Sequence, residues 1–395
     1  MRPDPRPLLL ALALACAAAL PARAERIADF MVMDVCLDAD GAVLQGAAPI
    51  DPGCQRRRKI AAGELPPYRL RNWPPRDAAC HDGLLIKYNL PVRRNGVERI
   101  VSFTDRATAS GCDTAPDAEA ELARGLSVQG HDAGYGYIMA SWSPVAMSSF
   151  ESPLCNGPGG DARRFERGWV LGPAELPPPG RPGWGVFPSR AASGPAALAG
   201  APCPARYNAG LTLWLLDTMD FGAARLPALV THHFARADAA GIAPGPAQQV
   251  ERTYWTHEFG LTRWEKWARE DWVHPRSARP AAELAAALFA RGRCTRPYAL
   301  PAILTPGLHT LPLAEAGLWR QVFIDPRTGE RHPWVMTLCE DYTNIVRAPP
   351  SAAALADASR LDDAYWRAPP APRTPPPHTP PARPPTAPVA AKAAP

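Results

Sequence analysis

Short apolar runs dominate the middle of the chain and predict β-strands. Each run covers four to seven residues, is rich in Val, Ile, Thr, Tyr and Trp, and is bounded by turn-forming residues. The expected strands are residues 100–103, 137–142, 211–216, 229–234, 251–257, 261–267, 321–324 and 334–339. Helical spacing is limited to residues 116–124 and 280–291, while residues 325–329 suit the loop of a hairpin. The pattern therefore predicts a mostly β protein, an antiparallel β-sandwich or partly closed barrel with a few short helices.

The predicted hairpin over residues 251–267, ERTYWTHEFGLTRWEKW, concentrates aromatic and charged side chains. With a turn at Phe259-Gly260, the alternation of side chains along each strand divides them between the two faces of the hairpin. One face would carry Arg252, Tyr254, Thr256, Glu258, Leu261, Arg263, Glu265 and Trp267, and the other Trp255, His257, Trp264 and Lys266. The expected register pairs Tyr254 with Glu265 and Trp255 with Trp264, and it brings both arginines within reach of Glu258 and Glu265.

Two interpretations of this hairpin stay open. Aromatic rings beside carboxylate and guanidinium groups suit a sugar site, because a pyranose stacks on a ring and its hydroxyls bond to planar charged groups. Glu258 and Glu265 are also weak candidates for a general acid and base. The alternative is a sheet interior stabilised by aromatic pairs and ion pairs.

The two ends of the chain predict export and a disordered tail. Residues 1–24 have a basic start, an apolar run from Leu8 to Leu20 and a small-x-small cleavage site before Glu25, which is typical of a signal peptide. A lipid anchor at Cys16 is the alternative. Residues 348–366 suggest a short helix, and the Pro-rich residues 367–395 suggest a disordered tail. The β-rich body is then residues 25–347, with a subdivision near 172–204 that is either a linker or an ordered crossover.

Cysteine usage agrees with an oxidising compartment. Removing the signal peptide leaves an even number of cysteines, which suits a disulfide framework. They are Cys36, Cys54, Cys80, Cys112, Cys155, Cys203, Cys294 and Cys339. Order along the chain suggests the pairs 36–54, 80–112, 155–203 and 294–339, although other pairings are open. No pair has the CxxC spacing of a zinc or redox site, and we expect no metal and no cofactor.

Charge and motifs narrow the function classes. The chain carries +5, but the signal peptide contributes +2 and the residues after Asp363 contribute +4, so the body is close to neutral. A neutral body lacks the basic face of a nucleic-acid-binding protein. We find no serine elbow, no HExxH and no phosphate-binding glycine loop, and no apolar run after the signal peptide is long enough to span a membrane.

Three weaker motifs have simpler structural explanations. His232 and His233 are neighbours in a strand and face opposite ways, so they cannot chelate one metal from it. The stretch from Asp38 to Gly41 is similar to the start of a calcium loop but lacks later ligands, so we expect a turn at Asp40-Gly41. Residues 130–137 suit a turn before a strand.

These patterns favour a periplasmic or secreted bacterial envelope protein, because the composition is typical of GC-rich bacterial codons. The leading hypothesis is a non-catalytic β-sheet protein that binds an envelope glycan, such as peptidoglycan, or another extended ligand. Its binding candidates are Arg252, Tyr254, Trp255, Arg263, Trp264 and Trp267, with Glu258 and Glu265 as further polar anchors. The alternatives are a carbohydrate-active enzyme that uses the two glutamates, and a spacer protein that acts through its tail.

Overall fold

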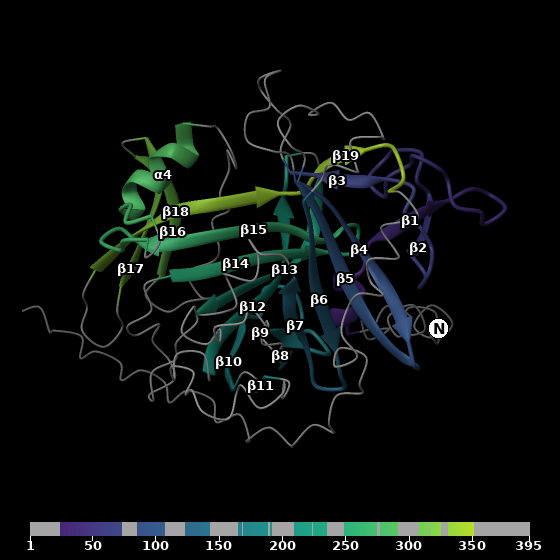
Figure 1. Cartoon of the computed structure of the whole chain (residues 1–395), viewed down its shortest axis with the longest axis horizontal. Coiled ribbons are helices and arrows are strands. Elements are labelled where there is room, and N and C mark those ends of the chain that lie inside the picture. Colours follow the sequence, from purple (N-terminus) through teal and green to yellow (C-terminus); the bar gives the residue numbers. More distant parts are fainter. Residues whose placement is uncertain are drawn as a thin grey trace, which may run out of the picture.

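The chain folds into two large antiparallel sheets, which confirms the predicted fold class (Figure 1). The computed structural model describes residues 24–72, 85–106, 123–142, 165–167, 169–188, 190–191, 209–222, 224–234, 249–274, 277–290, 308–315, 317–324 and 331–350. All eight predicted strands coincide with observed ones, and only the predicted strand 251–257 extends past its observed end, by one residue, His257. Over these described residues, no sheet closes into a barrel.

The larger sheet has eight strands and contains the predicted hairpin. Its order is β10 (Gly183–Pro188), β12 (Ala209–Asp220), β13 (Arg225–Phe234), β14 (Gln249–Thr256), β15 (Gly260–Arg269), β18 (Arg331–Asp341), β17 (Leu318–Ile324) and β16 (Leu308–Glu315). Strands β17 and β18 pair antiparallel, with Ile324 opposite Arg331, as the expected hairpin requires. The expected loop residues 325–329 lie outside the described residues.

The second large sheet has seven strands and lies to the right of the first in Figure 1. Its order is β19 (Asn344–Val346), β3 (Arg69–Arg71), β4 (Leu85–Arg94), β5 (Val97–Arg106), β6 (Ala123–His131), β7 (Tyr135–Trp142) and β9 (Trp169–Pro173). Two small ladders pair β1 (Asp34–Leu37) with β2 (Arg56–Lys59), and β8 (Phe165–Arg167) with β11 (Arg190–Ala191). Strand β9 packs against β10, β12 and β13, so it joins the two large sheets.

A short N-terminal helix, α2 (Ile27–Met31), lies between the two sheets. Its apolar residues Ile27, Phe30 and Met31 recur at helical spacing and are all buried. The helix contacts β13, β14 and β15 of one sheet and β6 and β7 of the other. A Cβ atom at Gly136 in β7 would come within 2.6 Å of Ile27, so the absence of a side chain there lets the helix approach the strand closely.

Other predicted segments can be compared with the described residues. The predicted helix over 280–291 is confirmed as α4 (Ala281–Ala290), which packs Ala281 and Ala285 against the larger sheet. The predicted helix over 116–124 is wrong at its end, because Ala123 and Arg124 begin β6; residues 116–122 lie outside the described residues. The proposed helix at 348–366 beyond Pro350 and the Pro-rich tail also lie outside them.

The described part of residues 172–204 is an ordered crossover. It leaves β9 in the seven-stranded sheet and continues into β10 at the edge of the eight-stranded sheet. Leu176 is buried and its backbone N–H donates to the carbonyl of Glu25 at 2.8 Å. The crossover therefore holds the start of the folded body against both sheets.

The eight-stranded sheet curls around one of its faces. Arg252 on β14 donates a hydrogen bond of 3.2 Å to Gln321 on β17, although β15 and β18 lie between these strands. In a flat sheet these two strands would lie about 14 Å apart, given about 4.8 Å per strand. Because side chains stand roughly perpendicular to a sheet, a bend of the sheet toward this side favours the contact, and we call this side the concave face.

Candidate functional site

A buried glutamate, Glu265 on β15, is the centre of a polar cluster on the concave face. Its carboxylate accepts from Trp267 Nε1 at 2.8 Å, Arg252 Nη1 at 3.2 Å and Tyr254 Oη at 3.4 Å. Arg263 Nε lies 2.8 Å from the same carboxylate. Each of these five side chains is at most 1% exposed. The strand alternation that predicted a shared face for them is confirmed.

The register of the hairpin differs from the prediction by two residues. Arg252 is opposite Glu265, Tyr254 is opposite Arg263, and Thr253 takes the place predicted for Trp255 opposite Trp264. The cause is a longer loop, because Thr256 pairs with Gly260 and an irregularity follows between Tyr254 and Trp255. A shift of two residues keeps Arg252, Tyr254, Arg263 and Glu265 on their predicted face while the predicted pairs are wrong. The predicted face of Leu261 is also wrong, because beyond the irregularity Leu261 pairs with Trp255.

Two arginines of the cluster share one carboxylate, that of Glu265. Arg252 and Arg263 both contact Glu265, and the next carboxylate, Asp341, lies 3.6 Å from Arg263 Nη1. Burial raises the pKa of Asp341, and Arg263 offsets part of that rise. Burial, followed by the charge of Glu265, also raises the pKa of Tyr254, which keeps its hydroxyl protonated.

Aromatic faces in the cluster are covered by the arginines themselves. The Arg252 guanidinium lies 5.2 Å from the centre of the Trp267 ring, and that of Arg263 lies 5.8 Å from the centre of the Tyr254 ring. Such cation–π contacts stabilise the cluster when water is excluded. They also occupy the ring surfaces on which a sugar would stack.

The remaining edge of Arg252 faces two neutral side chains. Its Nε donates to His232 Nε2 at 2.9 Å and its Nη2 donates to Gln321 Oε1 at 3.2 Å. Burial, followed by the charge of Arg252, lowers the pKa of His232 well below its usual value, so this imidazole is neutral. Sequence reasoning missed both residues as members of this cluster, because neither belongs to the 251–267 hairpin.

The other two predicted binding rings lie outside the cluster. Trp255 is fully buried and donates to Thr253 Oγ1 at 2.7 Å. Trp264 is half-buried, and Lys266 Nζ lies 4.7 Å from the centre of one of its rings while also pairing with Glu251 at 3.3 Å. Of the six aromatic and arginine candidates, Arg252, Tyr254, Arg263 and Trp267 come together with Glu265, whereas Trp255 and Trp264 do not.

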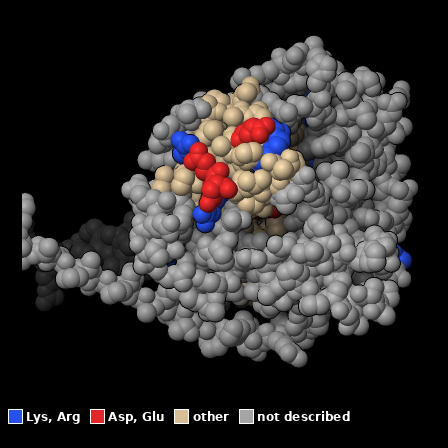
Figure 2. Space-filling model, turned by 60° about the vertical axis from the view of Figure 1, so that its left-hand side comes forward, with Lys and Arg blue, Asp and Glu red and all other residues tan. Residues whose placement is uncertain are grey.

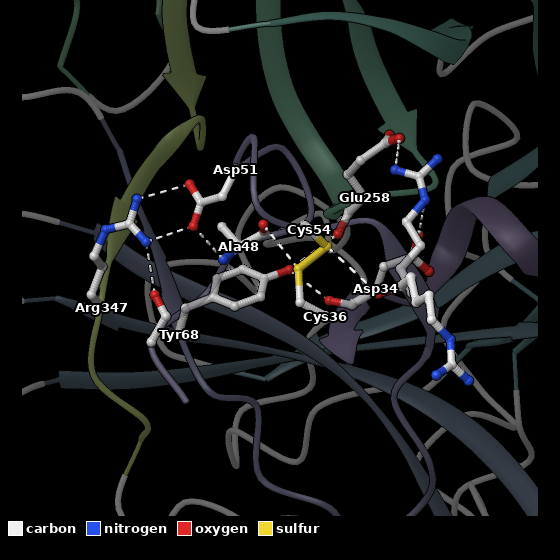
Figure 3. Close-up of a disulfide and its surroundings, with 11 residues drawn as sticks. Asp34, Cys36, Ala48, Asp51, Cys54, Tyr68, Glu258 and Arg347 are labelled. Carbon is white, nitrogen blue, oxygen red and sulfur yellow. Dashed lines mark hydrogen bonds and ion pairs between the residues drawn. A yellow bond between two sulfur atoms is a disulfide. The ribbon is translucent and has the colours of Figure 1, made fainter. Parts of the chain in front are cut away.

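Glu258 belongs to a separate cluster formed with the N-terminal segment (Figure 3). Its side chain is 3% exposed and accepts from Arg57 Nη1 at 2.7 Å, although Arg57 lies 201 positions earlier in the chain. Asp34 lies 2.9 Å from Lys59 Nζ and 3.5 Å from Arg57 Nε. Burial lowers the pKa of Lys59, and Asp34 offsets part of that shift. The predicted partners of Glu258, Arg252 and Arg263, instead share Glu265.

A disulfide between Cys36 and Cys54 holds this N-terminal segment, which confirms one predicted pair. Figure 3 shows it beside Tyr68, whose hydroxyl donates to the backbone carbonyl of Asp34 at 2.8 Å. Cys339 is also disulfide-bonded, and its partner is outside the described residues, as are the remaining predicted pairs.

An ion pair between Arg347 and Asp51, which we call the clasp, joins the two ends of the folded body. Arg347 donates to Asp51 at 2.6 and 2.8 Å through both terminal nitrogens. This bond is the main cause that lowers the pKa of Asp51. The disulfide and the clasp together fix residues 34–59 against the hairpin loop and the end of β19 (Figure 3).

Lys87 on β4 is a third buried cation with a different environment. Its Nζ lies 4.8 Å from the centre of the Tyr342 ring and the side chain is almost fully buried. Burial lowers the pKa of Lys87 to about 8, and the charge of Glu340 offsets only part of this effect. No described carboxylate lies within ion-pair distance of it.

The weaker sequence motifs have structural roles in the described residues. His232 contacts Arg252, whereas His233 contacts Thr212 and stacks on Trp169 at 4.0 Å, so the two imidazoles do face opposite ways. Asp38 accepts from the backbone N–H of Ala42 at 2.8 Å, which closes the expected turn.

Asp132 likewise accepts from the N–H groups of Gly134 and Tyr135 before β7, as expected of a turn. Within the described ranges no three His, Cys, Asp or Glu side chains lie together as a metal site would require.

Charged side chains on the described surface near α4 are paired with opposite charges. Figure 2 shows acidic and basic groups side by side on the part of the molecule that lies on the left of Figure 1. The ion pairs around α4 and the neighbouring strand ends are Arg269–Asp271, Arg279–Glu283 and Arg320–Glu270. Exposed pairs of this kind contribute little to stability.

Comparisons with protein-family models, with curated proteins and with solved structures found no match to this chain. Among the described residues, no helix combines the length and apolar character needed to cross a bilayer.

Proposed function

We propose that this chain is an exported, non-catalytic envelope protein that binds a glycan or another extended ligand at the concave face of its eight-stranded sheet. The observation that carries the proposal is the contact between Arg252 and Gln321. It gathers planar polar side chains from β13, β14, β15 and β17 around one guanidinium group. Planar groups in a water-excluded setting are suited to bidentate recognition of hydroxyl and carboxyl groups.

Export is part of the proposal and has two supports. The sequence of residues 1–24 is typical of a signal peptide. The Cys36–Cys54 disulfide is the kind of bond that persists in an oxidising compartment such as the periplasm or the extracellular space.

The distribution of carboxylates favours binding over acid–base catalysis. A glycosidase needs two carboxyl groups on either side of one glycosidic bond, about 5 to 10 Å apart. Glu265 and Glu258 instead belong to separate clusters, and each is bound by its own arginines. Because the two glutamates do not form one pair across a shared site, the enzymatic alternative has no specific support.

A glycan array probed with the mature chain tests the proposal. We expect retention on at least one envelope glycan, loss of that retention in Gln321→Leu, and no change in Trp264→Ala, which alters the opposite side of the hairpin. Thermal unfolding of each variant verifies its folding. Retention on no glycan would overturn the proposal, and loss in Trp264→Ala alone would move the site away from the concave face.

A further inference from the structure

Three buried N–H groups on the sheet face that carries Arg252 have no hydrogen-bond acceptor among the described residues. They are His232 Nδ1, Gln321 Nε2 and Trp334 Nε1, on side chains that are at most 2% exposed. His232 and Gln321 both touch the Arg252 guanidinium, and Trp334 is directly opposite Gln321 in the ladder of β17 and β18. The three side chains therefore belong to one face of the sheet, with Trp334 next to Gln321 and His232 on the other side of Arg252.

The chemistry of Arg252 fixes these atoms as donors. A guanidinium group can only donate, so the atoms that it meets, His232 Nε2 and Gln321 Oε1, must be acceptors. The neutral imidazole then carries its proton on Nδ1, and the Gln321 amide directs its NH₂ group elsewhere. The indole nitrogen of Trp334 can only donate. The cluster consequently has an excess of donors, which is costly in a buried setting unless an acceptor is supplied.

The charges of the cluster point to the same kind of ligand. Among the described residues, the one carboxylate that Arg252 contacts is Glu265, which it shares with Arg263, and its Nε and Nη2 edge meets only the neutral His232 and Gln321. This edge is the geometry that guanidinium groups use for carboxylates. Ring stacking is a poorer route to recognition here, because Arg252 and Arg263 cover Trp267 and Tyr254.

We propose that the concave face recognises a carboxylate group of its ligand, through Arg252 and the unmatched donors of Gln321 and Trp334. This inference rests on the proposed function and narrows it to acidic glycans, that is, chains containing a hexuronic acid or a carboxylate-substituted amino sugar. Binding involves no covalent step. A carboxylate oxygen takes the place of Gln321 Oε1 at Arg252 Nη2, and the carboxylate also accepts from Gln321 Nε2 and Trp334 Nε1, while His232 keeps its bond to Arg252 Nε.

The test compares two probes on the mature chain by isothermal titration calorimetry. One probe is a hexuronic acid oligosaccharide, and the other is the same oligosaccharide with its carboxyl groups reduced to alcohols. We expect the acidic probe to bind at least tenfold more tightly. Equal affinity would overturn the carboxylate assignment while leaving glycan binding intact. Failure of both probes would overturn the carboxylate assignment, and an array without any retained glycan would overturn the proposed function itself.

A pair of matched variants locates the site. Trp334→Phe removes an unmatched donor but keeps the ring, so we expect an affinity loss of about tenfold for the acidic probe, without a lower melting temperature. Trp255→Phe removes an indole donor that already bonds to Thr253, so it should lower the melting temperature and leave affinity unchanged. Gln321→Glu supplies a carboxylate from the protein and should block the acidic probe. Unchanged affinity in both Trp334→Phe and Gln321→Glu would overturn the inference.

Discussion

Two glutamates of one hairpin, Glu265 and Glu258, are buried in contrasting ways. The partners of Glu265 are Arg252, Tyr254, Arg263 and Trp267, all within the same seventeen-residue stretch. Glu258 instead depends on Arg57, whose side chain is 45% exposed and reaches it from the N-terminal segment. One carboxylate is thus neutralised by local strand pairing, and the other by long-range assembly that a disulfide helps to hold.

The largest expected effect follows from removing one charge of the local cluster. Glu265→Gln leaves two fully buried guanidinium groups with a single distant carboxylate, so we expect the free energy of unfolding to fall by about 3 to 5 kcal/mol. Glu258→Gln is the matched control and should cost about 1 kcal/mol, because water solvates the Arg57 partner. Urea unfolding measures both values. Similar losses would show that the two environments are energetically equivalent.

The disulfide should change the stability contribution of Glu258 but not that of Glu265. Replacing Cys36 and Cys54 by alanine opens a loop with a sequence separation of 18, which should cost about 3 kcal/mol. In this background, Glu258→Gln should have no further effect, whereas Glu265→Gln should keep its full cost. A double-mutant cycle in urea measures the coupling, and an unchanged cost for Glu258→Gln would contradict it.

Lys87 extends the comparison to a buried charge with no described carboxylate partner. Its folded-state pKa of about 8 lies below the ordinary value of 10.5, so the unfolded chain binds more protons between these pH values. Stability should therefore rise with pH across that window, by about 2 to 3 kcal/mol in total. Lys87→Met should abolish the rise, while Lys266→Met, which alters a lysine paired with Glu251, should not. Urea unfolding at pH 7.5, 9 and 10.5 makes the measurement.

The smallest effect is expected on the other face of the hairpin. Trp264 is half-buried and its main charged neighbour is Lys266, so Trp264→Ala should cost about 1 kcal/mol. Trp272→Ala, at another half-buried tryptophan, provides a comparison. A loss several times larger for Trp264 would mean that this face is as tightly packed as the concave one.

The contrast between the two glutamates also explains what the sequence could and could not predict. Strand alternation places Arg252, Tyr254, Arg263 and Glu265 together because all four belong to paired neighbouring strands. Nothing local links Glu258 to Arg57, or Arg252 to His232 and Gln321. The Arg252–His232 contact depends on the pairing of β14 with β13, the Arg252–Gln321 contact reaches across β15 and β18, and the Glu258–Arg57 contact depends on how the N-terminal segment folds back.

Long-range contacts also explain why some strands could not be predicted from the sequence. Strand β4 contains Lys87, Asn89 and Pro91, which argue against a buried strand when they are considered singly. In the structure Asn89 bonds to Ser102 on the next strand, and Ser102 in turn accepts from Gln129 at 2.7 Å. Polar side chains satisfied across neighbouring strands lose the alternation that signals a strand.

The position of α2 has a consequence for how the chain reaches its native state. Residues 27–31 are synthesised before all the strands that bury them, and β6, β7, β13, β14 and β15 follow up to more than 200 residues later. A helix of five residues is not stable alone in water. Its burial therefore belongs to the last stages of folding, and until then residues 27–31 stay accessible to chaperones and proteases.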